Sequence, residues 1–182
     1  MTITVPGTDS APGLTLRPWQ IRDIPMLLKV HTDPEMRRWL LHHIDDEDQA
    51  RAALEAQAQE WADRTRFVLA VVPADDEDAD PIGSVAVRRI NKSRDAAEVG
   101  YWTAPEARGR SVAVRAVEAV LAWATGEWAA ADIAISRFEL IHTMGNGASC
   151  RVAQKLGFEL VQQLPAFPPK FPNPGHLHVR RF

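Results

Sequence analysis

The sequence predicts one α+β domain, built on a central mixed, mainly antiparallel sheet with helices on its faces. Two observations support this fold class. Short apolar or alternating segments, which are typical of strands, follow one another through residues 66–103. Longer apolar stretches that open with helix-capping residues come before and after that block.

The N-terminal part predicts a leader, a strand and short helices. Residues 1–12 are rich in Thr, Pro, Gly and Ser, and we expect a flexible leader ahead of a single domain at 13–182. The alternating segment 14–19 predicts a first strand. Asp23 and Asp33 are each followed by a proline within two residues, which is typical of helix starts.

An acidic cluster, Asp45–Asp48, precedes a helix expected at 49–63. Carboxylates at the start of a helix interact favourably with its dipole. With His42 and His43 the cluster could also suggest zinc, but adjacent residues of a helix point in different directions. We therefore expect the acids to cap the helix, and we expect no bound metal.

Three strands, at 66–72, 82–89 and 97–103, are expected to form an antiparallel meander, because an acidic loop (73–81) and a short turn (91–95) join them. The elements after the meander alternate between helix and strand. They are a helix at 111–128, a strand at 137–142, a helix at 146–156, strands at 158–161 and 176–182, and a Pro-rich loop at 165–175.

The composition narrows the classes of function. The chain has 182 residues, a net charge of −3 and a single cysteine. A negative balance does not favour a broad nucleic-acid surface, and one cysteine excludes an internal disulfide and suits a reducing cytoplasm. The sequence shows no signal-peptide pattern and no apolar run long enough to span a bilayer. We therefore expect a cytoplasmic protein without nucleic-acid or membrane partners.

The most informative segment begins where the third strand of the meander ends, at Thr103. The chain passes Pro105 into a small basic loop, 108–113, and then into an apolar helix. Backbone N–H groups at a helix N-terminus lack intrahelical acceptors and favour an anion. Arg108 and Arg110 add positive charge beside them. The segment therefore predicts a cradle for a pyrophosphate.

The loop Arg108-Gly109-Arg110-Ser111-Val112-Ala113 resembles the acyl-CoA loop of the GNAT N-acetyltransferases, Arg/Gln-x-x-Gly-x-Gly/Ala, although Ser111 stands where the family usually has glycine. Further on, the segment from Asn146 to Phe158 reads Asn-x-x-Ser followed by Lys-Leu-Gly-Phe, which is similar to the RimJ/RimL-type branch. Two motifs in this order indicate the family more strongly than either alone. The resemblance extends from about Leu14 to Phe182.

This resemblance implies a GNAT-like fold with a splayed cleft for acetyl-CoA, the acyl donor, between the strands at 97–103 and 138–142. A glycine within a strand often marks a bulge, so a β-bulge near Val99–Gly100 is expected to open the splay. The resemblance also implies a set of cofactor contacts. They are Trp102, Thr103, Arg108, Gly109, Arg110, Ser111, Val112, Ala113 and Asn146.

Two residues are candidates for catalysis. Ser149 matches the position at which this branch places a serine near the cofactor sulfur. The resemblance implies that its hydroxyl donates to the departing thiolate. The alternative is a serine that bonds only to the backbone of its own helical turn. Glu98 is the candidate base for the amine proton, or else a strand carboxylate paired with an arginine. Glu139 and His142 are weaker base candidates. Asn146 is a helix cap, a pantetheine contact, or both.

These features predict direct transfer of an acetyl group from acetyl-CoA to a primary amine, at a protein N-terminus or on a small molecule, in a ternary complex. A non-catalytic CoA-binding regulatory module and a transferase of a larger acyl group such as succinyl are the alternatives. We do not expect a covalent acyl group on Cys150, because the sequence suggests no His or Asp partner for it. RimJ/RimL-type proteins are often dimers, so the resemblance also implies a homodimer.

Overall fold

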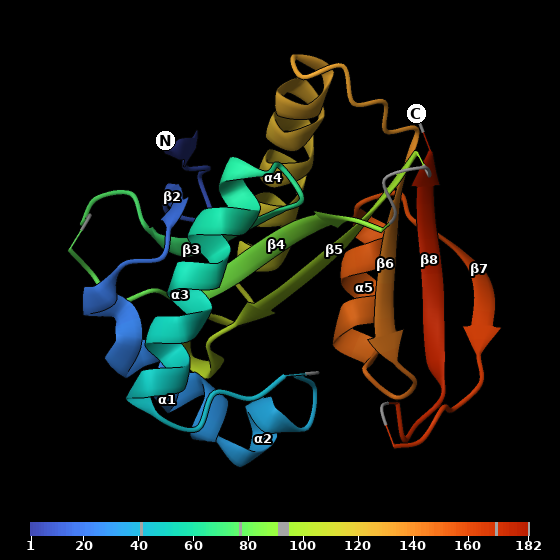
Figure 1. The fold of residues 1–182 in the computed structure, drawn as a ribbon, viewed down its shortest axis with the longest axis horizontal. Coiled ribbons are helices and arrows are strands. Elements are labelled where there is room, and N and C mark those ends of the chain that lie inside the picture. Colours follow the sequence, from blue (N-terminus) through green and yellow to red (C-terminus); the bar gives the residue numbers. More distant parts are fainter. Residues whose placement is uncertain (41, 77, 91–94, 170, 182) are drawn as a thin grey trace.

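The computed structural model describes residues 1–40, 42–76, 78–90, 95–169 and 171–181. The strands within these ranges form one eight-stranded sheet, in the order β1-β2-β3-β4-β5-β6-β8-β7. Helices α1–α3 cover one face of the sheet, and α4 and α5 cover the other (Figure 1). This arrangement confirms the predicted α+β class.

The first half of the chain supplies five successive antiparallel strands and the helices of one face. Its elements are β1 (Ile3–Val5), β2 (Leu14–Pro18), α1 (Ile24–Thr32), α2 (Pro34–Arg37), α3 (Glu47–Ala62), β3 (Arg66–Pro73), β4 (Gly83–Arg89) and β5 (Ala96–Thr103). The second half supplies the other face and the remaining strands. Its elements are α4 (Val112–Ala129), β6 (Arg137–Thr143), α5 (Gly147–Lys155), β7 (Glu159–Leu164) and β8 (Gly175–Arg181).

Strands β3 to β5 pair antiparallel in succession, which confirms the expected meander, and β2 pairs antiparallel with β3. Their alternating apolar residues form the main core with α4, where Trp128 is fully buried. The Asp46 side chain accepts a hydrogen bond from the Gln49 N–H at 2.8 Å, so the acidic cluster does cap α3. Part of the turn expected at 91–95, and residue 182 of the expected last strand, lie outside the described residues.

Residues 1–12, expected as a flexible leader, contribute β1, which pairs antiparallel with β2. The Arg115 guanidinium on α4 also donates to the carbonyls of Pro6 and Pro12, at 2.7 Å in each case. Part of this segment therefore forms the edge of the sheet. No helix within the described ranges is both long and apolar enough to cross a membrane.

The sheet opens between β5 and β6. These strands pair in parallel only from Ala96 to Val99 on β5, and beyond that point they diverge (Figure 1). The expected splay is therefore present, but the expected bulge at Val99–Gly100 is wrong, because β4 and β5 stay paired in continuous register through both residues. The opening arises because β6 continues along β8 over its whole length, whereas β5 continues along β4.

Candidate active site

Strand β5 presents its side chains alternately to the two faces of the sheet. Tyr101 packs against the core beneath α4. Trp102 points to the opposite face, where its ring centroid lies 5.9 Å from that of Trp19. The alternation places Glu98 and Gly100 on the same face as Trp102, which is the face covered by α1–α3.

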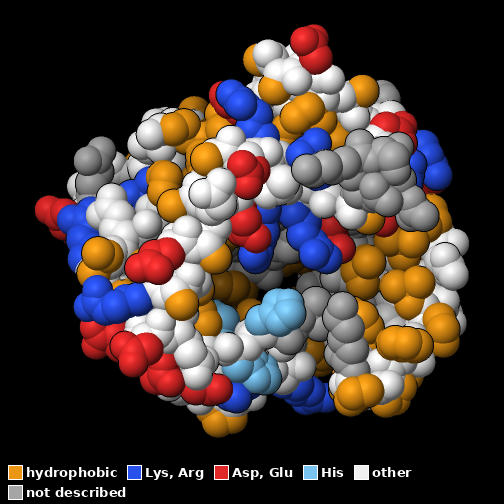
Figure 2. Space-filling view, viewed as in Figure 1, with side chains coloured by type: hydrophobic (Ala, Val, Ile, Leu, Met, Phe, Trp, Pro, Cys, Tyr) orange, Lys and Arg blue, Asp and Glu red, His pale blue; other side chains and the backbone are white. Residues whose placement is uncertain are grey.

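Gly100 marks open space beside the splay. It is exposed, and a Cβ atom built on it would meet no atom within 4 Å. The face of the molecule that carries α3 is hollowed near its centre, with basic, acidic and histidine side chains around the hollow (Figure 2). A substrate can therefore approach the splay from the α1–α3 side.

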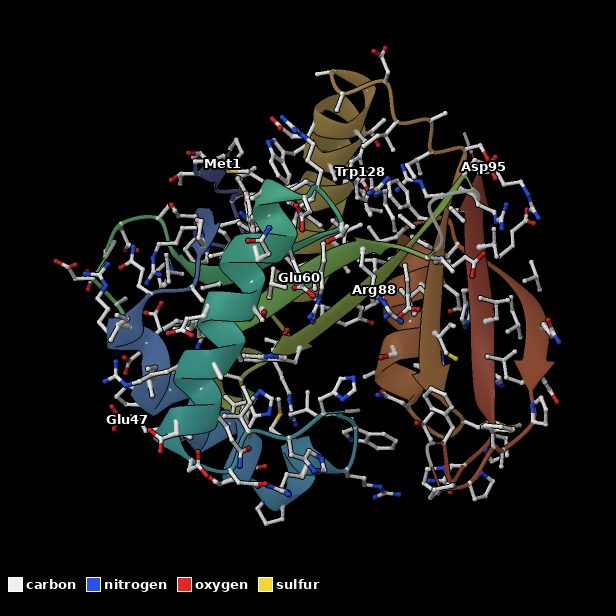
Figure 3. The ribbon with its side chains drawn as sticks, in the orientation of Figure 1. Met1, Glu47, Glu60, Arg88, Asp95 and Trp128 are labelled. Atoms are coloured by element: carbon white, nitrogen blue, oxygen red, sulfur yellow. The ribbon has the colours of Figure 1, made fainter. Side chains whose placement is uncertain are left out.

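A row of charged residues crosses the sheet where β5 and β6 are still paired. Arg88 and Glu98 are Cα partners on β4 and β5, and Glu98 and Glu139 are Cα partners on β5 and β6. Figure 3 shows Arg88 on the α3 side of the sheet, near the meeting of β5 and β6. Its guanidinium donates to the Glu98 carboxylate at 3.0 Å, and Arg137 donates to Glu139 at 3.1 Å.

Glu98 is thus paired with an arginine, as one of its two interpretations predicted. The side chain of Glu98 is 22% exposed, so the carboxylate stays in contact with solvent despite the pair. Glu98 also lies two residues before Gly100 on the same face. The carboxylate is therefore held beside the mouth of the splay.

The basic loop before α4 has an unusual backbone. Gly109 and Ser111 have φ values of 79° and 57°, both in the left-handed region, and with Arg110 between them they are exposed. The N–H of Arg115 donates to the Ser111 carbonyl at 3.1 Å, so the amides of 112–114 precede the first helical donor and have no intrahelical acceptor. The Ser111 side chain does not cap the helix. The start of α4 therefore presents several backbone donors to solvent.

The two arginines of this loop differ in their surroundings. Arg108 donates to the Glu35 carboxylate at 2.6 Å and lies 3.1 Å from the Met36 sulfur, so its guanidinium turns towards α2. The carboxylate offsets the charge that Arg108 was expected to add. Arg110 is exposed and forms no ion pair within the described part of the chain. Arg110 is thus the arginine best placed to meet an anion.

Asn146 begins α5, and its side chain accepts a hydrogen bond from the Ser149 N–H at 3.1 Å. The cap interpretation of Asn146 is therefore confirmed. Burial raises the pKa of the Tyr101 phenol to about 12, and the neighbouring Ser149 side chain partly offsets this rise by hydrogen bonding. The Tyr101 hydroxyl is buried and has no partner at full hydrogen-bonding geometry. It therefore remains protonated at neutral pH, as a second donor next to Ser149.

Cys150 has histidine neighbours that the sequence did not suggest. Its Sγ atom lies 3.3 Å from Nε2 of His142, 3.5 Å from Nδ1 of His176 and 4.0 Å from Nε2 of His178. The expectation that Cys150 lacks such partners is wrong, because pairing of β6 with β8 brings together histidines that are distant in sequence. Burial lowers the pKa of His142 and His178, which favours their neutral forms.

The fold is shared with several solved acetyltransferase structures. An acetyltransferase from Salmonella typhimurium that modifies the N-terminal serine of ribosomal protein L7/L12 is 16% identical, with a TM-score of 0.75 over 98% of this chain and 99% of that chain. Mycobacterium smegmatis RimJ in complex with CoA-disulfide is 15% identical, with a TM-score of 0.78 over 100% of this chain and 87% of that chain. The microcin C7 self-immunity acetyltransferase MccE, in complex with acetyl-CoA and AMP, is 14% identical, with a TM-score of 0.75 over 96% of this chain and 98% of that chain.

At these identities the structural likeness shows a common fold. A comparison with curated protein sequences found no match. The family model of the acetyltransferase (GNAT) domain matches residues 13–159, which include the splayed strands, the basic loop and α5. On this match, the chain is a GNAT-family acetyltransferase.

Proposed function

We propose that the chain transfers an acetyl group from acetyl-CoA to a primary amine, by direct attack of the amine within a ternary complex. The observation that carries this proposal is the splay between β5 and β6. The donor-rich loop, Ser149 and Tyr101 lie on its α4–α5 side, whereas Glu98 and Gly100 lie on its α1–α3 side. A cofactor and an acceptor can thus meet in the opening from opposite faces.

The cofactor would be held first at its pyrophosphate. The backbone donors of Gly109, Ser111, Val112 and Ala113 and the exposed Arg110 supply the contacts that such a group requires. The pantetheine arm would then lie along the part of β5 that β6 leaves unpaired, at Trp102 and Thr103, as an added strand does. Asn146, at the start of α5 and shortly after the end of β6, would contact the pantetheine arm as well as cap the helix.

The chemical step forms a C–N bond and breaks the thioester C–S bond. Glu98 would accept the proton of the attacking amine, directly or through a water. Backbone N–H groups beside the splay would stabilise the negative charge on the carbonyl oxygen. The hydroxyl of Ser149 or Tyr101 would donate a hydrogen bond to the leaving thiolate. The proton taken up by Glu98 would pass to solvent and the thiolate would take one from solvent, so free CoA and an amide would result.

We propose the same two classes of acceptor as the structural relatives display. One relative modifies a protein N-terminal serine, and another is an immunity enzyme solved with AMP bound. The open approach from the α1–α3 face supports a flexible amine such as a protein N-terminus or a small molecule. A cytoplasmic location, a homodimer, and the absence of nucleic-acid and membrane partners stay predictions.

The test is a transfer assay that measures CoA thiol release from acetyl-CoA against a panel of peptide N-termini and small amines. We expect Glu98→Gln to lower turnover by about 10²–10⁴-fold, the range of general-base catalysis, without weakening acetyl-CoA binding. Glu55→Gln, at an exposed position on α3, is the matched control and should leave the rate unchanged.

Two outcomes would contradict the proposal. Full turnover in Glu98→Gln would remove Glu98 as the base. Tight binding of acetyl-CoA without transfer to any amine in the panel would instead favour the non-catalytic CoA-binding module. Ser149→Ala and Tyr101→Phe, tested singly and together, would show which hydroxyl serves the leaving thiolate.

A further inference from the structure

Four side chains from three elements converge at the end of β6 that lies beside the splay. His142 on β6 and His176 on β8 are Cα partners, and His178 lies two residues further along β8. The pleat therefore places the three histidines on one face of the sheet. Cys150, in the first half of α5, points at them from above, and the four donor atoms lie within 4.8 Å of one another.

Several separations of these atoms approach those in the first coordination shell of a tetrahedral metal ion, while the group as a whole spans up to 4.8 Å. Zinc–nitrogen and zinc–sulfur bonds of about 2.0 and about 2.3 Å place tetrahedral ligand atoms about 3.3 Å apart for N···N and about 3.5 Å apart for S···N. The two Nε2 atoms of His142 and His178 lie 3.2 Å apart. Cys150 Sγ lies 3.3, 3.5 and 4.0 Å from the three imidazoles.

Hydrogen bonding on the outer side of the rings favours the same conclusion. Nδ1 of His142 lies 2.9 Å from the Thr143 carbonyl, an acceptor that requires a proton on Nδ1 and leaves a lone pair on Nε2. Nδ1 of His178 is also buried, and no partner among the described residues reaches it at full hydrogen-bonding geometry. If both rings carry their proton on Nδ1, two Nε2 lone pairs meet at 3.2 Å, and a cation between them satisfies both.

We propose that His142, Cys150, His176 and His178 bind a zinc ion. One thiolate and three imidazoles are ligands that zinc accepts, and no carboxylate of the described residues belongs to the group. Four protein ligands leave no open position, so the site is structural. It fastens the start of α5 to β6 and β8, and thereby fixes the position of Ser149.

Metal binding is measured without acyl transfer, so this proposal and the proposed function can fail separately. The direct test is metal content of the full chain, expressed in zinc-supplemented medium and purified without chelator, followed by removal of the metal and titration with Co²⁺. We expect one zinc per chain. The Co²⁺ protein should show a thiolate-to-metal charge-transfer band and the intense visible bands of tetrahedral Co²⁺.

Variants show which residues bind the ion. Cys150→Ser should abolish the charge-transfer band, and His178→Ala should weaken Co²⁺ binding by at least about 100-fold, since loss of mere outer-shell partners already costs 10–100-fold. His42→Ala, an exposed histidine outside the cluster, is the matched control and should bind as the unmodified chain does. The wild-type Co²⁺ spectrum decides the question even if a ligand variant does not fold.

Two results would overturn the inference. One is purified protein that lacks stoichiometric zinc and gives only the weak spectrum of octahedral Co²⁺. The other is a stoichiometric metal whose binding survives in both Cys150→Ser and His178→Ala. A different first-row metal in place of zinc would overturn the identity of the ion.

Discussion

The loop before α4 contains two residues in the left-handed conformation, a glycine that adopts it readily and a serine that does not. Substituting each one tests whether the backbone conformation of the loop affects stability. Gly109 has φ 79° and Ser111 has φ 57°. A Cβ on Gly109 would meet nothing within 4 Å, so Gly109→Ala changes backbone preference without adding a clash. The Ser111 side chain makes no capping hydrogen bond. Ser111→Gly therefore removes the strain of a left-handed residue and costs no cap.

The magnitude follows from two opposing terms. A left-handed conformation costs a residue with a Cβ about 1–2 kcal/mol, whereas glycine gives the unfolded chain an entropy advantage of about 0.4–1 kcal/mol. The net effect is about 1 kcal/mol in each case, with opposite signs. For a chain of this size we expect Gly109→Ala to lower the Tm, and Ser111→Gly to raise it, by about 2–4 °C.

Thermal and urea unfolding of the two variants beside the unmodified chain measure this directly. The double variant should return close to the original stability if the two positions act independently. A Tm that falls in Ser111→Gly would refute the reasoning, because it would mean that the serine at this position is not strained. A Tm unchanged in Gly109→Ala would refute it equally.

Three further predictions concern the rest of the chain. Asp23→Ala removes the carboxylate that contacts the buried Arg17 guanidinium at 2.7 and 2.9 Å; urea unfolding should show a loss of about 3–5 kcal/mol, and a loss below about 1 kcal/mol would contradict this. Burial is the main cause that lowers the pKa of His31, and the charges of His43 and Arg37 lower it further. The His42 backbone and Asp45 only partly offset this. The unfolded state therefore binds more protons, and stability should fall as the pH drops below 6.5 and level off below the folded-state pKa, with a smaller fall in His31→Gln; equal falls in urea titrations of both proteins would count against it. Gly100→Val fills the open space at the splay and should keep the Tm but abolish acetyl transfer; full activity would place the reaction elsewhere.

The meander and its flanking helices were predictable because their signals are local. The alternating segments of β3 to β5 and the capping residues Asp33 and Asp46 specify their elements within a few residues. The edge strand β1 was not predicted, since three residues ahead of a Pro- and Gly-rich stretch are too few to show a clear period. The ion pair of Arg108 with Glu35 was also missed, because it joins α2 to a loop distant in sequence.

The cause of the splay and the histidine cluster depend on strand pairing that no local pattern encodes. The glycine at 100 suggested a bulge, yet the register of β4 and β5 is continuous and pairing with β6 simply ends. The alternation of His176 and His178 is a readable signal of a shared strand face. Only the pairing of β6 with β8 adds His142, and only the packing of α5 adds Cys150.

The central claim is that the loop before α4 binds acetyl-CoA, and titration calorimetry with acetyl-CoA tests it most directly. We predict saturable binding to the unmodified chain and to the control Arg51→Ala, which alters an exposed arginine paired with Glu47 on α3. Arg110→Ala should weaken binding by about 10–150-fold, the equivalent of about 1.5–3 kcal/mol for a hydrogen bond to a charged group. Equal affinity in Arg110→Ala and Arg51→Ala, or no binding to the unmodified chain, would contradict the account.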